Sequence, residues 1–216
     1  MGNACVGQFH AARQQGGNPL ALSSWCITTG DRAVADALVD LYGGSAQESK
    51  TGSDFGVEVL TCCDRIPVVL RGGRSVSFHM VLRAGEELFH VCDGNRFLTP
   101  ADKRGAFCGC APTFPERKAA AWSGRGPRPE VRMDFLLADL PEAGPFFLVS
   151  SSWELAESLG SLAGALDEVE GPALCALSLQ LVEFSTLSGA RVSYRRPVVE
   201  IEGRATGVLG EMTLAA

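Results

Sequence analysis

Apolar residues recur along this chain at two spacings, and the helical spacing, together with helix start signals, predicts three helices. These cover residues 31–42, 113–122 and 151–168. In the first and third, apolar side chains recur every three or four positions, which places them on one face of a helix; the second is predicted from its start signal and from Gly124, which ends it. Thr29 or Asp31 is in position to cap the first helix. Thr113 and Ser151 each stand three residues before a glutamate, which is the spacing of a capping box.

Alternating or short continuous apolar runs, bounded by glycine, proline and polar clusters, predict strands. They cover residues 20–27, 55–61, 66–70, 76–82, 86–92, 131–137, 145–149, 173–186 and 191–201. Ser188-Gly189 is expected to turn the last two into a hairpin. Residues 20–70 and 146–201 both give the order strand, helix and two strands. The pattern therefore predicts an α+β protein with two similar β-α-β-β halves and a cysteine-bearing section inserted between them.

This pattern divides the chain into five parts. We predict a mobile arm (1–18), a first α+β half (19–71), an inserted cysteine-bearing section (72–130), a second α+β half (131–202) and a loose tail (203–216). The arm is predicted to be mobile because it is small, polar and glycine-rich, without a sustained apolar period.

The inserted section carries three cysteines in a pattern typical of metal ligands. Cys92 ends an apolar run, and Cys108 and Cys110 follow after a polar loop, separated by a single glycine. A Cys-x-Cys pair on a loop, facing another cysteine, indicates thiolates that converge on one ion. The sequence therefore predicts a structural zinc site that holds this section together.

Structural zinc takes four donors, so a fourth ligand must come from elsewhere. His90 is one candidate, because positions 90 and 92 of a strand project to the same face. Cys62 and Cys63 are the other candidates. The alternative to a metal site is that these thiols are small buried hydrophobic groups, which is how free cysteine usually behaves.

Composition limits the class of protein and its surroundings. The chain has 216 residues, 46% of them hydrophobic, which is typical of one globular domain or two small ones. No run reaches about 18 apolar residues, so no membrane span is expected, and the N-terminus lacks the pattern of a secretory signal. The eight cysteines are therefore expected to stay reduced in a cytosol, free for metal binding or burial.

The net charge argues against a protein that binds DNA by itself. The net charge is -6, whereas affinity for duplex DNA comes mostly from neutralising phosphates. One basic cluster stands out, consisting of Arg117, Lys118, Arg125 and Arg128. A solvated helix face with its loop is the favoured explanation of this cluster. Any action on DNA is therefore expected to pass through a partner that holds the DNA.

Several motifs resemble one known family in both sequence and order. They are GDRAVAD (30–36), LYGG (41–44), CDG (92–94), CGCAP (108–112), FPERK (114–118), GPAL (171–174), VEF (182–184), SG (188–189), VSY (192–194) and RPVV (196–199). Over residues 25–202 the chain resembles the recombination directionality factors of actinobacterial phages that use large serine integrases. Members of that family commonly carry one further cysteine in a glycine-rich segment after the FPERK helix, and here Pro127 stands in that place.

The resemblance implies a function without catalysis. Such factors bind the phage's serine integrase on its att DNA in the cytoplasm of the bacterial host. They switch the integrase from integration between attP and attB to excision between attL and attR. Phe107, Phe114 and Trp122 are candidate partner contacts, because aromatic residues are enriched at interface anchors. The alternative for each is packing beneath the metal site.

Two other classes of function compete with this one. A Cys-His nucleophile pair could be built from Cys92 and His90, but two residues apart on one strand is an unusual arrangement for it. The chain could also be a metal-stapled adaptor or structural protein of a mobile element with another protein partner. A neighbouring serine integrase gene would distinguish the directionality factor from this adaptor.

Overall fold

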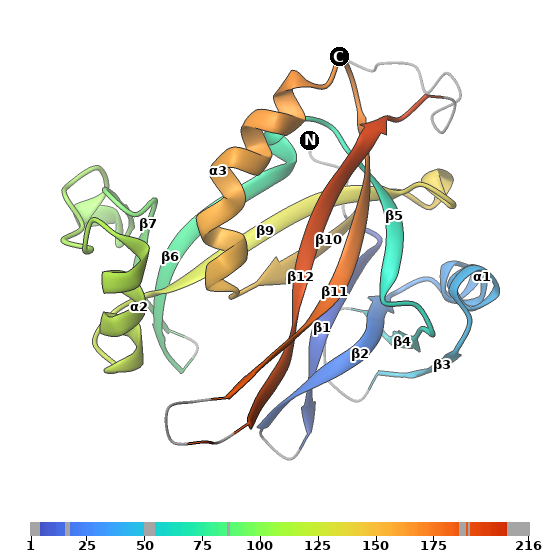
Figure 1. Ribbon diagram of the computed structural model, residues 1–216, viewed down its shortest axis with the longest axis horizontal. Helices are drawn as coiled ribbons and strands as arrows, with labels where there is room; N and C mark the ends of the chain where they lie inside the picture. Colours follow the sequence, from blue (N-terminus) through green and yellow to red (C-terminus); the bar gives the residue numbers. More distant parts are fainter. Residues whose placement is uncertain are drawn as a thin grey trace. The chain divides into compact units, whose positions relative to one another are not determined.

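The computed structural model of the protein describes residues 5–15, 18–49, 55–85, 87–185, 189 and 191–206. These residues form a mixed α+β structure, as predicted (Figure 1). The helices are α1 (Arg32–Tyr42), α2 (Phe114–Trp122) and α3 (Trp153–Glu168). The strands are β1 (Gly7–Gln15), β2 (Asn18–Thr29), β3 (Ser45–Glu48), β4 (Val57–Leu60), β5 (Arg65–Leu70), β6 (Val76–Ala84), β7 (Glu87–Cys92), β8 (Phe97–Thr99), β9 (Arg128–Leu137), β10 (Phe146–Ser150), β11 (Ala173–Ser185) and β12 (Arg191–Arg204).

The chain forms two compact units, named here by their contents. The sheet unit comprises Met1–Ser75, Met133–Leu148 and Ala163–Ala216, and the cysteine unit comprises Val76–Arg132 and Val149–Leu162. Strand β9 and helix α3 contribute residues to both. Whether the chain also contains two similar halves stays a prediction. The first of those halves also holds a strand outside the predicted set, β3, in which Ser45–Glu48 pairs with β4.

Strands β12-β11-β5-β9-β10-β1-β2-β4-β3 follow one another across the sheet. Strand β1 pairs with β2 in antiparallel and with β10 in parallel orientation. The core of the sheet unit centres on Phe9, which is fully buried. Its ring lies 5.5 Å from that of Trp25, 5.1 Å from that of Phe135 and 5.9 Å from that of Phe146, in edge-to-face arrangements.

The predicted mobile arm is wrong for residues 7–15, which form β1 between β2 and β10. Residues 7–9 pair with both β2 and β10, most of the rest of the segment pairs with β2, and Phe9 supplies its apolar anchor. At Gly7 an added Cβ would lie 2.5 Å from the carbonyl oxygen of Thr28, so close packing explains the glycine. The predicted tail also begins too early, because β12 extends to Arg204. Residues 207–216 and Ser188 of the predicted hairpin turn lie outside the described residues.

Two of the three predicted helix starts are confirmed, and the third is shifted by one residue. The Asp31 carboxylate accepts hydrogen bonds from the first turn of α1, and Thr113 and Glu116 form the capping box of α2. At α3, Ser152 takes the place predicted for Ser151. Its Oγ accepts a hydrogen bond from the backbone N–H of Leu155 at 3.2 Å.

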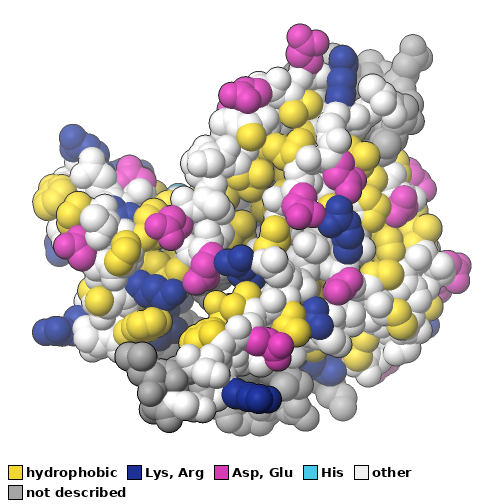
Figure 2. Space-filling view, in the orientation of Figure 1, with side chains coloured by type: hydrophobic (Ala, Val, Ile, Leu, Met, Phe, Trp, Pro, Cys, Tyr) yellow, Lys and Arg dark blue, Asp and Glu magenta, His cyan; other side chains and the backbone are white. Residues whose placement is uncertain are grey.

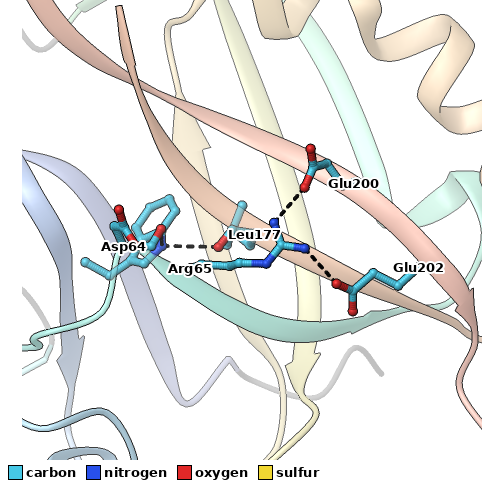
Figure 3. A network of polar contacts seen from close by, with 6 residues as sticks. Asp64, Arg65, Leu177, Glu200 and Glu202 are labelled. Carbon is cyan, nitrogen blue, oxygen red and sulfur yellow. Dashed lines mark hydrogen bonds and ion pairs between the residues drawn. The ribbon is translucent and has the colours of Figure 1, made fainter.

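Side-chain contacts tie β12 and β11 to the rest of the sheet (Figure 3). The guanidinium of Arg65 on β5 donates to the carboxylates of Glu200 and Glu202 on β12, at 2.6 and 2.7 Å. The buried indole of Trp25 donates to the carbonyl oxygens of Asp64 and Leu177, at 3.1 and 3.3 Å. The first two bonds join β5 to β12, the two neighbours of β11, and the other two join Trp25 on β2 to β11 and to the residue before β5.

In the cysteine unit, β7 pairs in antiparallel fashion with β6 on one side and with β8 on the other. The ring of Phe114, at the start of α2, lies 5.8 Å from the ring of Phe78 and 6.5 Å from that of Trp153. Helix α2 is thus anchored by aromatic packing. Across the described part of the chain, no helix combines the length and the apolar character needed to cross a membrane.

Candidate metal centre

Four potential metal ligands come together in the cysteine unit. They are His90 and Cys92 from β7, and Cys108 and Cys110 from the loop before α2. One ligand atom from each of the four residues lies within 4.8 Å of the others. The three predicted cysteines and the predicted histidine are therefore brought to one place.

Strand geometry places the first two ligands. Alternate residues of a strand project to one face, so His90 and Cys92 point the same way from β7. Cys92 is fully buried, and its Sγ accepts a hydrogen bond from the backbone N–H of Gly94 at 3.3 Å. The Asp93 carboxylate accepts from the backbone N–H groups of Asn95 and Arg96, at 2.8 and 2.7 Å. These bonds define the turn that follows Cys92.

Backbone contacts position the other two ligands. The N–H of Cys108 donates to the carbonyl oxygen of Asn95 at 2.9 Å. Gly109, between the cysteines, has φ +74, a left-handed conformation that favours glycine. The guanidinium of Arg117 on α2 donates to the carbonyl oxygens of Ala111 and Gly94, at 2.6 and 2.9 Å. Arg117 therefore joins both turns that carry the cysteines.

The spacing of the donors fits a tetrahedral zinc site. The Sγ atoms of Cys92 and Cys110 lie 3.6 Å apart, and Sγ of Cys110 lies 3.6 Å from Nε2 of His90. Zinc bonds of about 2.3 Å to sulfur and about 2.0 Å to nitrogen would place tetrahedral ligands about 3.8 Å and about 3.6 Å apart. These two separations, and the donor set of three thiols and one imidazole, are those of a closed structural zinc site.

Burial affects the protonation of these ligands in the absence of an ion. It raises the pKa of the Cys92 and Cys110 thiols and lowers the pKa of the His90 imidazole. Lys103 also lowers the pKa of His90, whose ring packs 4.5 Å from that of Phe97. The imidazole is thereby held in the neutral form that binds metals. A bound cation must displace the thiol protons, so metal binding releases protons.

The alternative fourth ligands lie elsewhere. Cys62 and Cys63 belong to the sheet unit, where Cys62 is exposed and the thiol of Cys63 donates to the carbonyl oxygen of Tyr42 at 3.5 Å. His90 completes the set of four without either of them. It also does so without residue 127, where Pro127 replaces the further cysteine expected from the resemblance.

The three aromatic candidates for partner contact differ in exposure. Phe107 is 70% exposed and Trp122 is 73% exposed, whereas Phe114 is half-buried between Phe78 and Trp153. These two ring contacts indicate that Phe114 packs inside the cysteine unit. Phe89, on the side of β7 opposite His90, is 50% exposed and was not predicted. The strand alternation that identified His90 could have found it.

Together, the fold and the four donors define a mixed α+β protein with a candidate structural metal centre. The comparison with known families is more specific. The chain belongs to the Gp3-like family, described as recombination directionality factor-like, whose family model matches residues 2–203. The match includes the sheet unit from β1 to β12 and all four candidate ligands. No solved structure matches the chain. The family description indicates a regulator of DNA recombination whose partner is a recombinase.

Proposed function

We propose that this protein is a recombination directionality factor that binds a phage-encoded serine integrase on its att DNA. Binding switches the integrase from integration between attP and attB to excision between attL and attR. The observation that carries this proposal is the family match over residues 2–203. The motifs of a serine-integrase partner, among them CGCAP and FPERK, support the finer assignment.

The charge distribution supports action through a protein rather than on bare DNA. The sheet unit contains 10 Lys and Arg against 17 Asp and Glu, and the cysteine unit 9 against 8. On the face shown in Figure 2, the two signs are interspersed rather than gathered. Two members of the predicted basic cluster have partners, since Arg117 binds carbonyl oxygens and Lys118 pairs with Glu154 at 3.2 Å. Little direct DNA binding is therefore expected.

The proposed role is conformational and not catalytic. Strand cleavage belongs to the integrase, and the factor binds one arrangement of that enzyme better than another. A ligand shifts an equilibrium only by its difference in affinity for the two states. Turning a tenfold preference into the opposite tenfold preference takes about 2.7 kcal/mol. A modest protein interface supplies a difference of this size.

In this proposal, His90, Cys92, Cys108 and Cys110 hold a structural zinc ion. Four protein ligands leave no open position, which is the arrangement of structural rather than catalytic zinc. The ion would cross-link β7 to the loop before α2. That loop carries the exposed Phe107, so the site would keep a candidate contact surface in place. The cytoplasm of the bacterial host suits this chemistry, since all the described cysteines are free thiols.

A gel-shift experiment with purified integrase tests the proposed partner. Integrase is bound to labelled attL or attR DNA at physiological salt, and this protein is then added. The proposal predicts a further shift of the integrase–DNA complex and no shift of DNA without integrase. Retardation of bare att DNA, with no effect on the integrase complex, would contradict it.

A further inference from the structure

The cysteine unit contains an open groove that the metal centre does not use. Its volume is about 410 Å³. Strands β6 and β9, the end of α2, the glycine-rich turn that follows it and Ser151 form its walls. All of these lie within one unit, so the groove is complete in that unit alone.

Part of the lining of the groove is apolar and part is polar. Val81, Ala121 and Pro129 contribute to it, and all three are buried. Gly126 packs directly against α2, because an added Cβ there would lie 2.8 Å from the Cβ of Ala120. The turn therefore approaches the helix without a side chain of its own at this point.

Charged side chains line the same groove. A guanidinium nitrogen of Arg83 lies 3.2 Å from a carboxylate oxygen of Glu130, so these two lining residues form an ion pair. Arg128 is exposed, and its side chain makes no hydrogen bond or ion pair with the other described residues. The groove thus combines apolar lining residues with one guanidinium that has no acidic partner in the described part of the chain.

An exposed aromatic residue follows one of the lining residues in the sequence. Trp122 lies between two lining residues in the sequence, Ala121 and Gly124, and is 73% exposed. The ammonium group of Lys118 lies 5.3 Å from its ring centroid. Tryptophan is enriched among the residues that dominate protein interfaces, so its exposure makes Trp122 a candidate contact.

We propose that this groove binds an amphipathic segment of the partner recombinase. An apolar side chain of that segment enters the groove, and an aspartate or glutamate beside it pairs with Arg128. This inference rests on the proposed function and names the surface that serves it. A nucleic acid suits the groove less well, since one unpaired cation neutralises few phosphates and the lining also carries the carboxylate of Glu130.

Two substitutions test the groove without touching the core. Ser151 is exposed and precedes the residue that caps α3, so Ser151→Trp fills the groove while Ser151→Ala leaves it open. Arg128→Glu reverses the unpaired charge. Arg191→Glu makes the same charge change on β12, in the sheet unit. Circular dichroism and metal content identify any variant that is misfolded.

The measurement is the dissociation constant of the full-length protein for purified serine integrase, with att DNA alone as a second probe. We expect Ser151→Trp and Arg128→Glu to weaken integrase binding at least tenfold, and the two controls to bind like the unaltered protein. Integrase binding that is unchanged in both groove variants overturns this inference and leaves the proposed function standing. If the unaltered protein does not bind integrase, both this inference and the proposed function are wrong. A loss confined to DNA binding would assign the groove to nucleic acid instead and overturn the inference.

Discussion

Nε2 of His90 lies 3.6 Å from Sγ of Cys110, although twenty positions separate the two residues in the sequence. A strand supplies the first ligand and a glycine-containing loop supplies the second. Neither residue alone indicates a metal. Their convergence with Cys92 and Cys108 distinguishes this cluster from the protein's other cysteines.

The protein is expected to contain about one zinc ion per chain when purified without chelator, because the four donors satisfy a tetrahedral site. His90→Ala and Cys110→Ser should each lower the zinc content well below that of the unaltered protein. Cys62→Ser, which changes an exposed cysteine outside the site, should not. Elemental analysis of the unaltered protein and the three variants measures the zinc content. Zinc near zero in the unaltered protein would mean that the thiols are simply buried groups.

Arg117→Ala is expected to weaken zinc binding about 10- to 100-fold, although Arg117 is not a ligand. Its guanidinium holds the carbonyl oxygens of Gly94 and Ala111, one in each turn that carries cysteines. Arg125→Ala is the matched control, since Arg125 bonds to Ser123 and not to these turns. Competition with a chromophoric chelator measures the affinities. Equal zinc affinity in the two variants would show that Arg117 does not organise the site.

Stability is expected to fall as the pH is lowered through about 6.5, in part because of His10. Burial lowers the pKa of its imidazole below the usual value, and its Nε2 lies 2.9 Å from Oγ1 of Thr28. Below pH 6.5 the unfolded chain therefore binds more protons at this residue than the folded chain, which favours unfolding. His10→Gln should reduce this pH dependence. Urea denaturation at pH 5.5 and 7.5 tests it, and an unchanged difference between the two pH values would contradict the assignment.

Phe9→Ala is expected to destabilise the protein by about 3–5 kcal/mol, because it removes a fully buried ring from the centre of three aromatic contacts. Phe184→Ala is the control, since that ring is 49% exposed and should cost less than about 1 kcal/mol. Chemical denaturation compares the two variants. A negligible effect of Phe9→Ala would instead support a mobile N-terminal arm.

Local signals in the sequence predicted local structure well. Asp31, Thr113 and the alternation of His90 and Cys92 identified two helix starts and the face of β7 that carries two candidate ligands. These features depend on residues close together in the chain. The shift of the third cap from Ser151 to Ser152 was not predictable, because adjacent serines offer the same hydroxyl.

Long-range contacts explain what the sequence did not predict. Strand β1 consists mainly of small and polar residues, with Phe9 as its large apolar side chain. Its structure comes from pairing with β10, more than a hundred residues away in the chain. The groove likewise combines Val81, Ala121 and Ser151, which no local pattern connects. The choice of His90 over Cys62 and Cys63 as fourth ligand also required the fold.

A recombination assay tests the central claim most directly. Purified serine integrase is given attL and attR substrates, or attP and attB substrates, with and without this protein. The account predicts that the protein raises the yield of excision product from attL and attR and lowers the yield of integration product from attP and attB. Equal yields with and without the protein, in both reactions, would contradict it.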